Sequence, residues 1–154
     1  MIREMRHDDL IEVMALYEQW RFEQAQYRGQ WEDHEGLGQD LEGRLTEAIA
    51  SSEILCSVND IGTALTGVAL AVLVDLEGSV VGRKMCRVEW LFVQDDNRRD
   101  GIASSLLEAA EEWARESDAV GVEMGVLPGH RDAKNFCERR GLKARLLVMA
   151  KRWD

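Results

Sequence analysis

A chain of 154 residues is long enough to bury one hydrophobic core, and we expect residues 1–154 to form a single domain. Hydrophobic residues make up 45% of the sequence and charged residues 31%, with one proline, which together exclude a disordered or low-complexity chain. A net charge of −10 disfavours binding to nucleic acid, and no apolar stretch approaches the roughly 20 residues of a membrane span, so we expect a cytoplasmic protein.

The charge is unevenly distributed along the chain. Residues 1–60 hold 5 Lys or Arg against 14 Asp or Glu, whereas residues 131–154 hold 8 against 3. The acidic half favours a cationic partner, although a net charge of this size also serves solubility alone.

The three cysteines, Cys56, Cys86 and Cys137, are widely spaced and form no C-x-x-C pair, so the sequence predicts reduced thiols and no metal site.

The first half of the chain predicts, in order, a strand, two helices and two strands. Residues 1–6 alternate polar and apolar side chains, as strands do. Asp8 is placed to cap a helix whose apolar face is predicted from residues at helical spacing: Leu10, Ile11, Met14, Tyr17 and Trp20. A polar loop over residues 27–38 leads to a shorter helix, which is marked by Leu41, Leu45 and Ile49. Residues 54–58 and 63–74 then have the composition of buried strands.

The second half predicts strands and helices in alternation. Residues 86–93 indicate another buried strand, and a helix follows from Ile102 to Glu116. The remaining segments are typical of a strand over residues 120–127, a helix over residues 131–140 closed by Gly141 at C′, and a last strand over residues 144–152. The order β-α-α-β-β-β-α-β-α-β predicts a mixed α/β fold around one central sheet.

The segment NRRDGIASSLL, residues 97–107, joins a buried strand to the next helix. A helix start exposes backbone N–H groups at the positive end of the helix dipole, and such a turn binds phosphate. Gly101 allows the close approach of an anion, and Ala103 leaves the first helical turn uncrowded. Arg98 and Arg99 add positive charge beside the loop. On spacing alone, a purely structural helix start is the competing interpretation.

Two segments carry motifs that can be compared with known families. LFVQDDNRRDGIA, residues 91–103, is an apolar strand followed by R-x-x-G-x-A and a helix, and AKNFCERRGL spans residues 133–142. The first segment resembles the acetyl-CoA signature of the GNAT superfamily of N-acetyltransferases, R/Q-x-x-G-x-G/A after an apolar strand. The second resembles that superfamily's A-x-x-F-Y-E-x-x-G-F motif, and the predicted element order is similar along the whole chain.

The resemblance implies an enzyme that moves an acetyl group from acetyl-CoA, as cosubstrate, to a primary amine by direct attack in a ternary complex. It further implies a pyrophosphate on the amides of residues 98–104 and a pantetheine arm paired with the strand edge near Leu91 and Val93. The expected acetyl-CoA-binding residues are Leu91, Phe92, Val93, Arg98, Arg99, Asp100, Gly101, Ile102, Ala103, Ser104, Asn135 and Phe136. On this interpretation the two arginines mark a local anion site on an acidic chain.

Glu89 is the candidate general base. It lies in an apolar strand, where burial would raise the pKa of a carboxyl group toward the useful range. GNAT enzymes similar to this chain, aminoglycoside acetyltransferases among them, often have an acidic residue at this position. The alternative is a carboxylate that forms an ion pair with Arg87 or with another arginine at the edge of the core.

Cys137 stands where the second motif has the tyrosine that protonates the leaving thiolate. A thiol can in principle take that role, and the alternative is a small helix residue that only packs. The other candidates for the proton donor are solvent, Tyr17 and Tyr27, or the thiolate leaves without a proton donor. His130 replaces the motif's leading asparagine, and it either titrates near neutral pH or caps the helix.

In the superfamily the acceptor lies against the first two helices and the loop between them, where this chain interleaves aromatic and acidic residues. Trp20 is expected in the core, and the residues expected to bind a small cationic amine are Trp31, Tyr27, Glu23 and Asp33. A protein or peptide amine as acceptor, and a module that senses acyl-CoA without turnover, are the alternatives. One strand after the last helix, where the family has a hairpin, leaves an open sheet edge and suggests a homodimer.

Overall fold

The computed structural model describes residues 1–27, 40–76, 78, 82–151 and 153. The strands are β1 (Ile2–Glu4), β2 (Ile54–Asp60), β3 (Leu65–Asp75), β4 (Lys84–Val93) and β5 (Val122–Met124). The helices are α1 (Leu10–Gln24), α2 (Leu41–Ala50), α3 (Ile102–Glu116) and α4 (Arg131–Arg139). Two short 3₁₀ turns, η1 (His7–Asp9) and η2 (Asp95–Asn97), precede α1 and α3.

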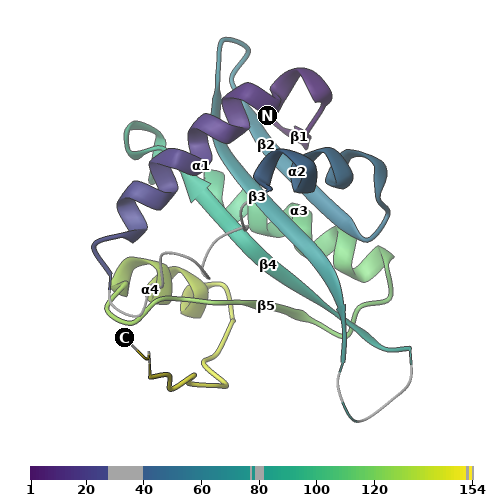
Figure 1. The fold of residues 1–154 in the computed structure, drawn as a ribbon, viewed down its shortest axis with the longest axis vertical. Coiled ribbons are helices and arrows are strands. Elements are labelled where there is room, and N and C mark those ends of the chain that lie inside the picture. The colour runs from purple at the N-terminus through teal and green to yellow at the C-terminus, as the bar shows by residue number, and fades with distance from the viewer. Residues whose placement is uncertain (28–39, 77, 79–81, 152, 154) are drawn as a thin grey trace.

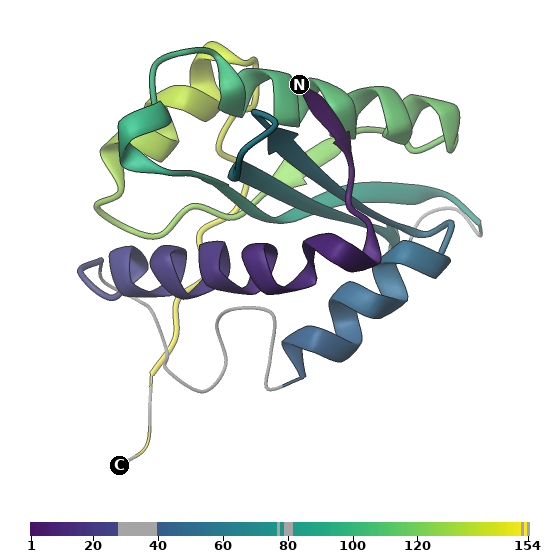
Figure 2. The same ribbon diagram turned by 90° about the horizontal axis from the view of Figure 1, so that it is seen from above.

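These elements form three layers around one sheet (Figure 1). Seen from above, α1 and α2 lie on one face of the sheet, and α3 and α4 lie on the other (Figure 2). The strands follow the order β1-β2-β3-β4-β5 and are antiparallel, except that β5 runs parallel to β4. The predicted mixed α/β fold with one central sheet is therefore confirmed.

A β-bulge interrupts β4 at Glu89. On β3, Leu70 faces Trp90 and the next residue, Ala71, faces Val88, so Glu89 has no partner on β3. An extra residue reverses the alternation of side chains along a strand. Val88 accordingly packs against α3, whereas Trp90 packs against α1. The bulge turns Glu89 to the face covered by α1 and α2, where it contacts α2.

The first turn of α3 lies close to β3 at Gly67. A Cβ atom at this glycine would lie 3.1 Å from Ile102 Cγ2 and 3.2 Å from Leu106 Cδ1. A larger residue would require these two side chains to shift by a few tenths of an ångström. The absence of a side chain at Gly67 thus lets the start of α3 pack closely on β3.

The start of α1 differs from the prediction. Asp8 is exposed and caps nothing, because η1 comes first and Asp9 takes over the polar contacts. The Asp9 carboxylate accepts the Arg6 N–H at 2.7 Å and pairs with Arg3 of β1 at 2.7 and 2.8 Å. Arg3 also contacts Asp60 at the end of β2, so this network anchors α1 to the edge of the sheet.

Four of the five residues predicted for the apolar face of α1 pack in or against the core, and Ile11 does not. Ile11 is 83% exposed, whereas Val13, Leu16 and Tyr17 are buried. Ile11 lies six positions before Tyr17, which is not a multiple of the helical period, so the two cannot share one narrow face. Trp20 does pack against the core, in contact with the rings of Tyr17 and Trp90.

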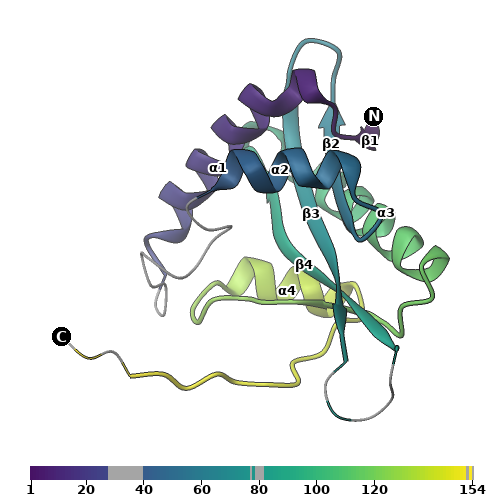
Figure 3. The ribbon, with the colours of Figure 1, turned by 45° about the vertical axis from the view of Figure 1, so that its right-hand side comes forward.

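The predicted last strand over residues 144–152 is wrong for residues 144–151, which the structure describes as unpaired. After α4 and Gly141, which has the expected positive φ of 85°, the chain runs away from the sheet (Figure 3). The run Leu146, Leu147, Val148 and Met149 is 81% to 89% exposed. Four consecutive apolar residues are typical of a strand whose two faces are both buried. The sheet offers no such place for this run, because its outer strand at this side, β5, is only three residues long.

Candidate functional site

The loop before α3 holds a row of unpaired backbone N–H groups. Arg99 and Gly101 both have positive φ, 74° and 78°, which turns the chain sharply into the helix. The Ser105 N–H donates to the Gly101 carbonyl at 3.0 Å and closes the first turn. Within the described part of the chain, the N–H groups of residues 99–104 have no hydrogen-bond acceptor. They lie at the positive end of a 15-residue helix, so the loop can hold a phosphate group.

The side chains of this loop divide into two kinds. Ile102 and Ala103 are partly buried against the sheet, where they fix the first turn of α3, and Ser104 beside them is partly buried too. Arg99 and Asp100 are exposed next to the free N–H groups. Arg99 makes no ion pair with any residue that the structure describes, so its positive charge is available to an anion.

The end of β4 has a main-chain edge with no strand partner, although Arg98 Nε donates to its Val93 carbonyl at 2.7 Å. β5 pairs with β4 only as far as Val88. The Gln94 N–H donates to the Thr66 carbonyl of β3 at 3.0 Å. Because consecutive residues of a strand direct their polar groups to opposite sides, those of Val93 and of Leu91 point away from β3. An extended chain of amides can pair with this edge, which lies beside the loop before α3.

Arg98 is turned toward α1. Its Nε donates to the Val93 carbonyl at 2.7 Å, and its two Nη groups donate to the two carboxylate oxygens of Glu23 at 2.7 and 2.8 Å. It also pairs with Asp95 at 2.6 Å and lies over the Phe92 ring, 5.6 Å from the centroid. The contact with Glu23 first, and the charge of Asp95 after it, raise the pKa of Arg98. Arg98 therefore ties α1 to the end of β4, and it is shared by the carboxylates of Glu23 and Asp95.

A cavity of about 630 Å³ opens beside this ion pair, between the end of α1 and the end of β4. It is lined by Gln19, Phe22, Glu23, Ala25, Gln26, Phe92, Asp95 and Arg98. Phe22 is 87% exposed, so its ring is free to contact a ligand. Two carboxylates, one guanidinium and two aromatic rings suit a cationic ligand. Phe92 belongs to the core cluster that contains the buried residues of α1, it lines this cavity, and its role in binding acetyl-CoA stays a prediction.

Tyr27, at the end of α1, stacks on His130, at the start of α4, with ring centroids 4.1 Å apart and 14° between the planes. His130 Nδ1 accepts the Ala133 N–H at 3.2 Å, so the helix-capping interpretation of His130 is confirmed. Burial lowers the pKa of His130 and raises the pKa of Tyr27. The stacked rings join the end of α1 to the start of α4.

Glu89 is partly buried and paired with an arginine. Arg44 Nη2 of α2 donates to Glu89 Oε2 at 2.6 Å, and the Glu89 side chain is 24% exposed. Arg87 instead pairs with Glu123 of β5. The ion pair with an arginine other than Arg87 agrees with the alternative interpretation of Glu89, and its role as base stays a prediction. Sequence reasoning did not identify Arg44 as the partner, since 45 positions separate the two residues and no local pattern marks the contact.

The remaining predicted residues are less accessible or lie elsewhere. Cys137 is 7% exposed, and burial raises the pKa of its thiol, which fits the packing interpretation, and its role as proton donor stays a prediction. Phe136 packs against the core beneath α3, and Asn135 is exposed on α4. Trp31 and Asp33, predicted to contact the acceptor, lie outside the described residues.

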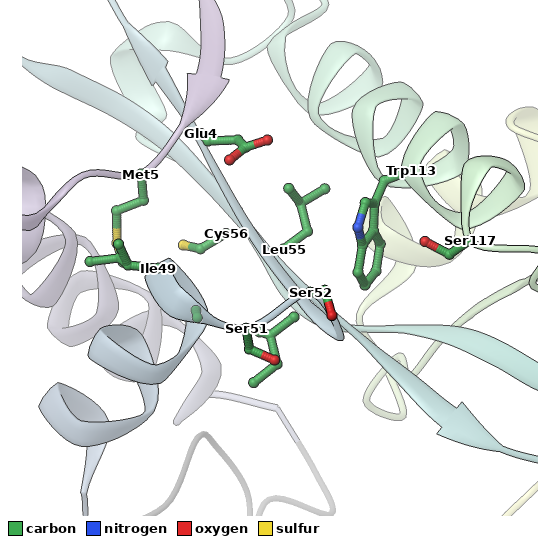
Figure 4. Close-up of a pocket in the computed structure, with 11 residues that line it drawn as sticks. Glu4, Met5, Ile49, Ser51, Ser52, Leu55, Cys56, Trp113 and Ser117 are labelled. Atoms are coloured by element: carbon green, nitrogen blue, oxygen red, sulfur yellow. The ribbon is translucent and has the colours of Figure 1, made fainter.

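A second cavity, of about 330 Å³, lies between α2, β2 and α3. In Figure 4, Trp113 and Leu55 border it on one side, and Met5 and Cys56 border it on the other. None of its lining residues belongs to the predicted site, and it lies away from the end of β4. In the residues that the structure covers, no helix is long and apolar enough to cross a membrane, and no cluster of metal-ligating side chains occurs.

The sequence of the chain matches that of a known protein family. Residues 11–142 match the sequence profile of the Acetyltransferase (GNAT) family. That range includes the loop before α3, the bulge of β4 and the start of α4. No curated protein matches the chain at a significant level.

Solved structures share the fold over nearly the whole chain. A tetramutant of the BH1408 protein from Bacillus halodurans has a TM-score of 0.81 at 21% identity, covering 99% of both chains. The aminoglycoside N-acetyltransferase AAC(6')-Iy in complex with CoA has a TM-score of 0.73 at 16% identity, covering 99% of this chain and 100% of the other. A ribosomal-protein-alanine N-acetyltransferase from Brucella melitensis has a TM-score of 0.70 at 16% identity, covering 99% of both. At these identities the likeness concerns the fold.

Proposed function

The chain belongs to the GNAT acetyltransferase family, and from that premise we propose that it transfers an acetyl group from acetyl-CoA to a primary amine of a small cationic molecule. The observation that carries the proposal is the position of the free N–H groups of residues 99–104 beside the unpaired edge of β4. A pyrophosphate fits the first, and the amides of a pantetheine arm fit the second. Arg99 supplies exposed positive charge at the same place.

Acetyl-CoA supplies an activated acetyl thioester. In a direct transfer, the amine nitrogen forms a bond to the acetyl carbon, the carbon–sulfur bond breaks, and its electron pair leaves on sulfur. The amine loses a proton in the process, and Glu89 accepts it, directly or through one water. The bulge of β4 supports this role, because it turns Glu89 out of the strand pairing and toward the face that carries the cavity beside Glu23.

The acceptor is proposed to be a small cation because the cavity lining is acidic and aromatic. The two negative charges of Glu23 and Asp95 exceed the single positive charge of Arg98. Phe22 offers an exposed ring for a cation–π contact. Two of the similar folds are aminoglycoside N-acetyltransferases, which supports a small-molecule amine. The ribosomal-protein-alanine N-acetyltransferase among them keeps a protein amine as the second candidate.

Exchange of Glu89 for Gln tests the proposed base. Glu89→Gln keeps the shape of the side chain but cannot accept the proton, so we expect kcat to fall about 100-fold or more. Calorimetry should show acetyl-CoA affinity within about twofold of the unchanged protein, since the loop before α3 is untouched. Glu53→Gln, which alters the exposed partner of Lys84, is the matched control with unchanged turnover. Equal turnover of Glu89→Gln across the pH range contradicts the assignment.

The homodimer and the cytoplasmic location are proposals as well. The exposed apolar run from Leu146 to Met149 and the short outer strand β5 support a second copy of the chain as partner. The three cysteines are free and buried, which suits a reducing compartment. A module that senses acyl-CoA without turnover is the remaining alternative, and product formation separates it from the enzyme.

A further inference from the structure

The contact between Arg44 and Glu89 joins α2 to the bulge of β4. Arg44 Nη2 lies 2.6 Å from Glu89 Oε2, with side-chain exposures of 34% and 24%. Partly exposed ion pairs of this kind contribute only about 0–1 kcal/mol to folding. Stability alone therefore gives little reason to place an arginine here, beside a carboxylate that lies outside the strand pairing.

The contact is one-sided. Arg44 binds Oε2, and among the described residues Glu89 Oε1 has no hydrogen-bond partner. The backbone of α2 is held in place at Arg44, because the next residue, Leu45, is fully buried in the core. A charge-assisted hydrogen bond to one oxygen sets the orientation of the whole carboxylate group. The second oxygen is then held in one direction and remains available.

We propose that Arg44 is a positioning residue for Glu89: it holds the carboxylate by Oε2 and leaves Oε1 to accept the proton of the acceptor amine. This inference rests on the proposed function, in which Glu89 is the base. A proton acceptor must lie within about 2.6–3.2 Å of the atom it serves or of a bridging water, so its orientation affects the rate directly. Without Arg44, the glutamate side chain is free to rotate about its χ angles, and productive orientations become rarer.

Loss of Arg44 should lower kcat and leave the KM for acetyl-CoA nearly unchanged. We expect Arg44→Gln to lower kcat about tenfold, because the carboxylate loses its orientation. The KM for acetyl-CoA should stay within about twofold, since α2 does not border the loop before α3. Arg44→Lys should restore part of kcat, because an ammonium group can still donate to Oε2 but lacks the planar geometry of a guanidinium. Arg115→Gln, on the exposed side of α3, is the matched control with unchanged kinetics.

A double-mutant cycle tests whether Arg44 acts through Glu89. Turnover is measured for Arg44→Gln, Glu89→Gln and the double variant, with thermal melting to verify that each is folded. If Arg44 only positions Glu89, the double variant should turn over at the same rate as Glu89→Gln alone. Independent, multiplicative losses overturn the inference, and so does unchanged kcat in Arg44→Gln. Full turnover of Glu89→Gln is a different outcome, which overturns the base assignment itself and the role of Arg44 with it.

Discussion

Gly101 is the residue on which the phosphate loop depends most. Its φ of 78° lies in the left-handed region, and a Cβ there would meet no atom within 4 Å, so the cost of substitution is backbone strain rather than a clash. We predict that Gly101→Val weakens acetyl-CoA binding about tenfold or more, or roughly 1.4 kcal/mol. Calorimetry provides the measurement.

Two variants sharpen this test. Gly101→Asn should bind within about threefold of the unchanged protein, because asparagine tolerates positive φ better than other residues do. Gly62→Val introduces the same strain at another positive φ of 87°, in the turn between β2 and β3, outside the predicted site. Tight binding by Gly101→Val would show that the loop does not hold the phosphates.

The cysteine thiols are protected by burial. Cys56, Cys86 and Cys137 are all buried, and desolvation raises the pKa of Cys56 to about 12 and that of Cys86 to about 11. We predict that a thiol reagent at pH 8 labels none of the three in the folded protein and all three in denaturant. Rapid labelling of the native protein contradicts this. The prediction has practical value, because unreactive cysteines permit a thiol assay of the CoA released.

At the scale of elements, the Arg3–Asp9 pair anchors α1 to β1. The hydrogen bond from Arg3, with that from the Arg6 N–H, lowers the pKa of Asp9. A depressed carboxyl pKa stabilises the fold at pH values above the ordinary carboxyl value of about 3.9, and the benefit disappears as the pH falls through the lower, folded-state pKa. We predict that Asp9→Asn lowers the free energy of unfolding at pH 7 by about 2 kcal/mol.

Thermal melting measures this effect and its pH dependence. Asp9→Asn should lower Tm by roughly 4–8 °C at pH 7, and the gap should narrow in strong acid. Asp8→Asn is the matched control, since Asp8 is exposed and outside the network, and its Tm should not change. A Tm difference for Asp9→Asn that is the same at every pH argues against the ion pair as its origin.

Local sequence signals predicted the elements that depend on local physics. The helix from Ile102 to Glu116 has the predicted bounds, because its glycine start and its apolar spacing are both written into one short segment. The bulge at Glu89 and its contact with Arg44 left no such signal, since they arise where distant segments meet. The strand expected over residues 144–152 failed for a related reason. A strand forms only when another strand pairs with it, and composition cannot supply the partner.

At the scale of the whole molecule, the exposed run from Leu146 to Met149 predicts self-association. Each such side chain gains about 1.5–3 kcal/mol on full burial, which is sufficient to favour a dimer over an exposed segment. Light scattering at micromolar concentration should give twice the chain mass of 17.5 kDa. Leu147→Asp should return the monomer while the fold persists, and Ile11→Asp, at an exposed apolar residue on α1, serves as control. A monomer in the unchanged protein contradicts the homodimer.

The overall charge distribution fits a cation acceptor and an anionic cosubstrate on one molecule. The N-terminal half, which contributes Glu23 to the cavity lining, carries most of the negative charge, and the free N–H groups before α3 can provide a local anion site. The cavity and the loop both adjoin the end of β4, and Glu89 lies in the bulge of the same strand. The proposed acetyl transfer requires donor and acceptor to meet at the base.

The most direct test incubates the protein with isotopically labelled acetyl-CoA and a mixed panel of amines, and detects products by mass spectrometry. The panel contains aminoglycosides, polyamines, amino acids, and lysine and N-terminal peptides. We predict label on small cationic amines, and none on the peptides. Label on peptides alone contradicts the proposed acceptor, and no labelled amine despite measurable acetyl-CoA binding contradicts the proposed enzyme.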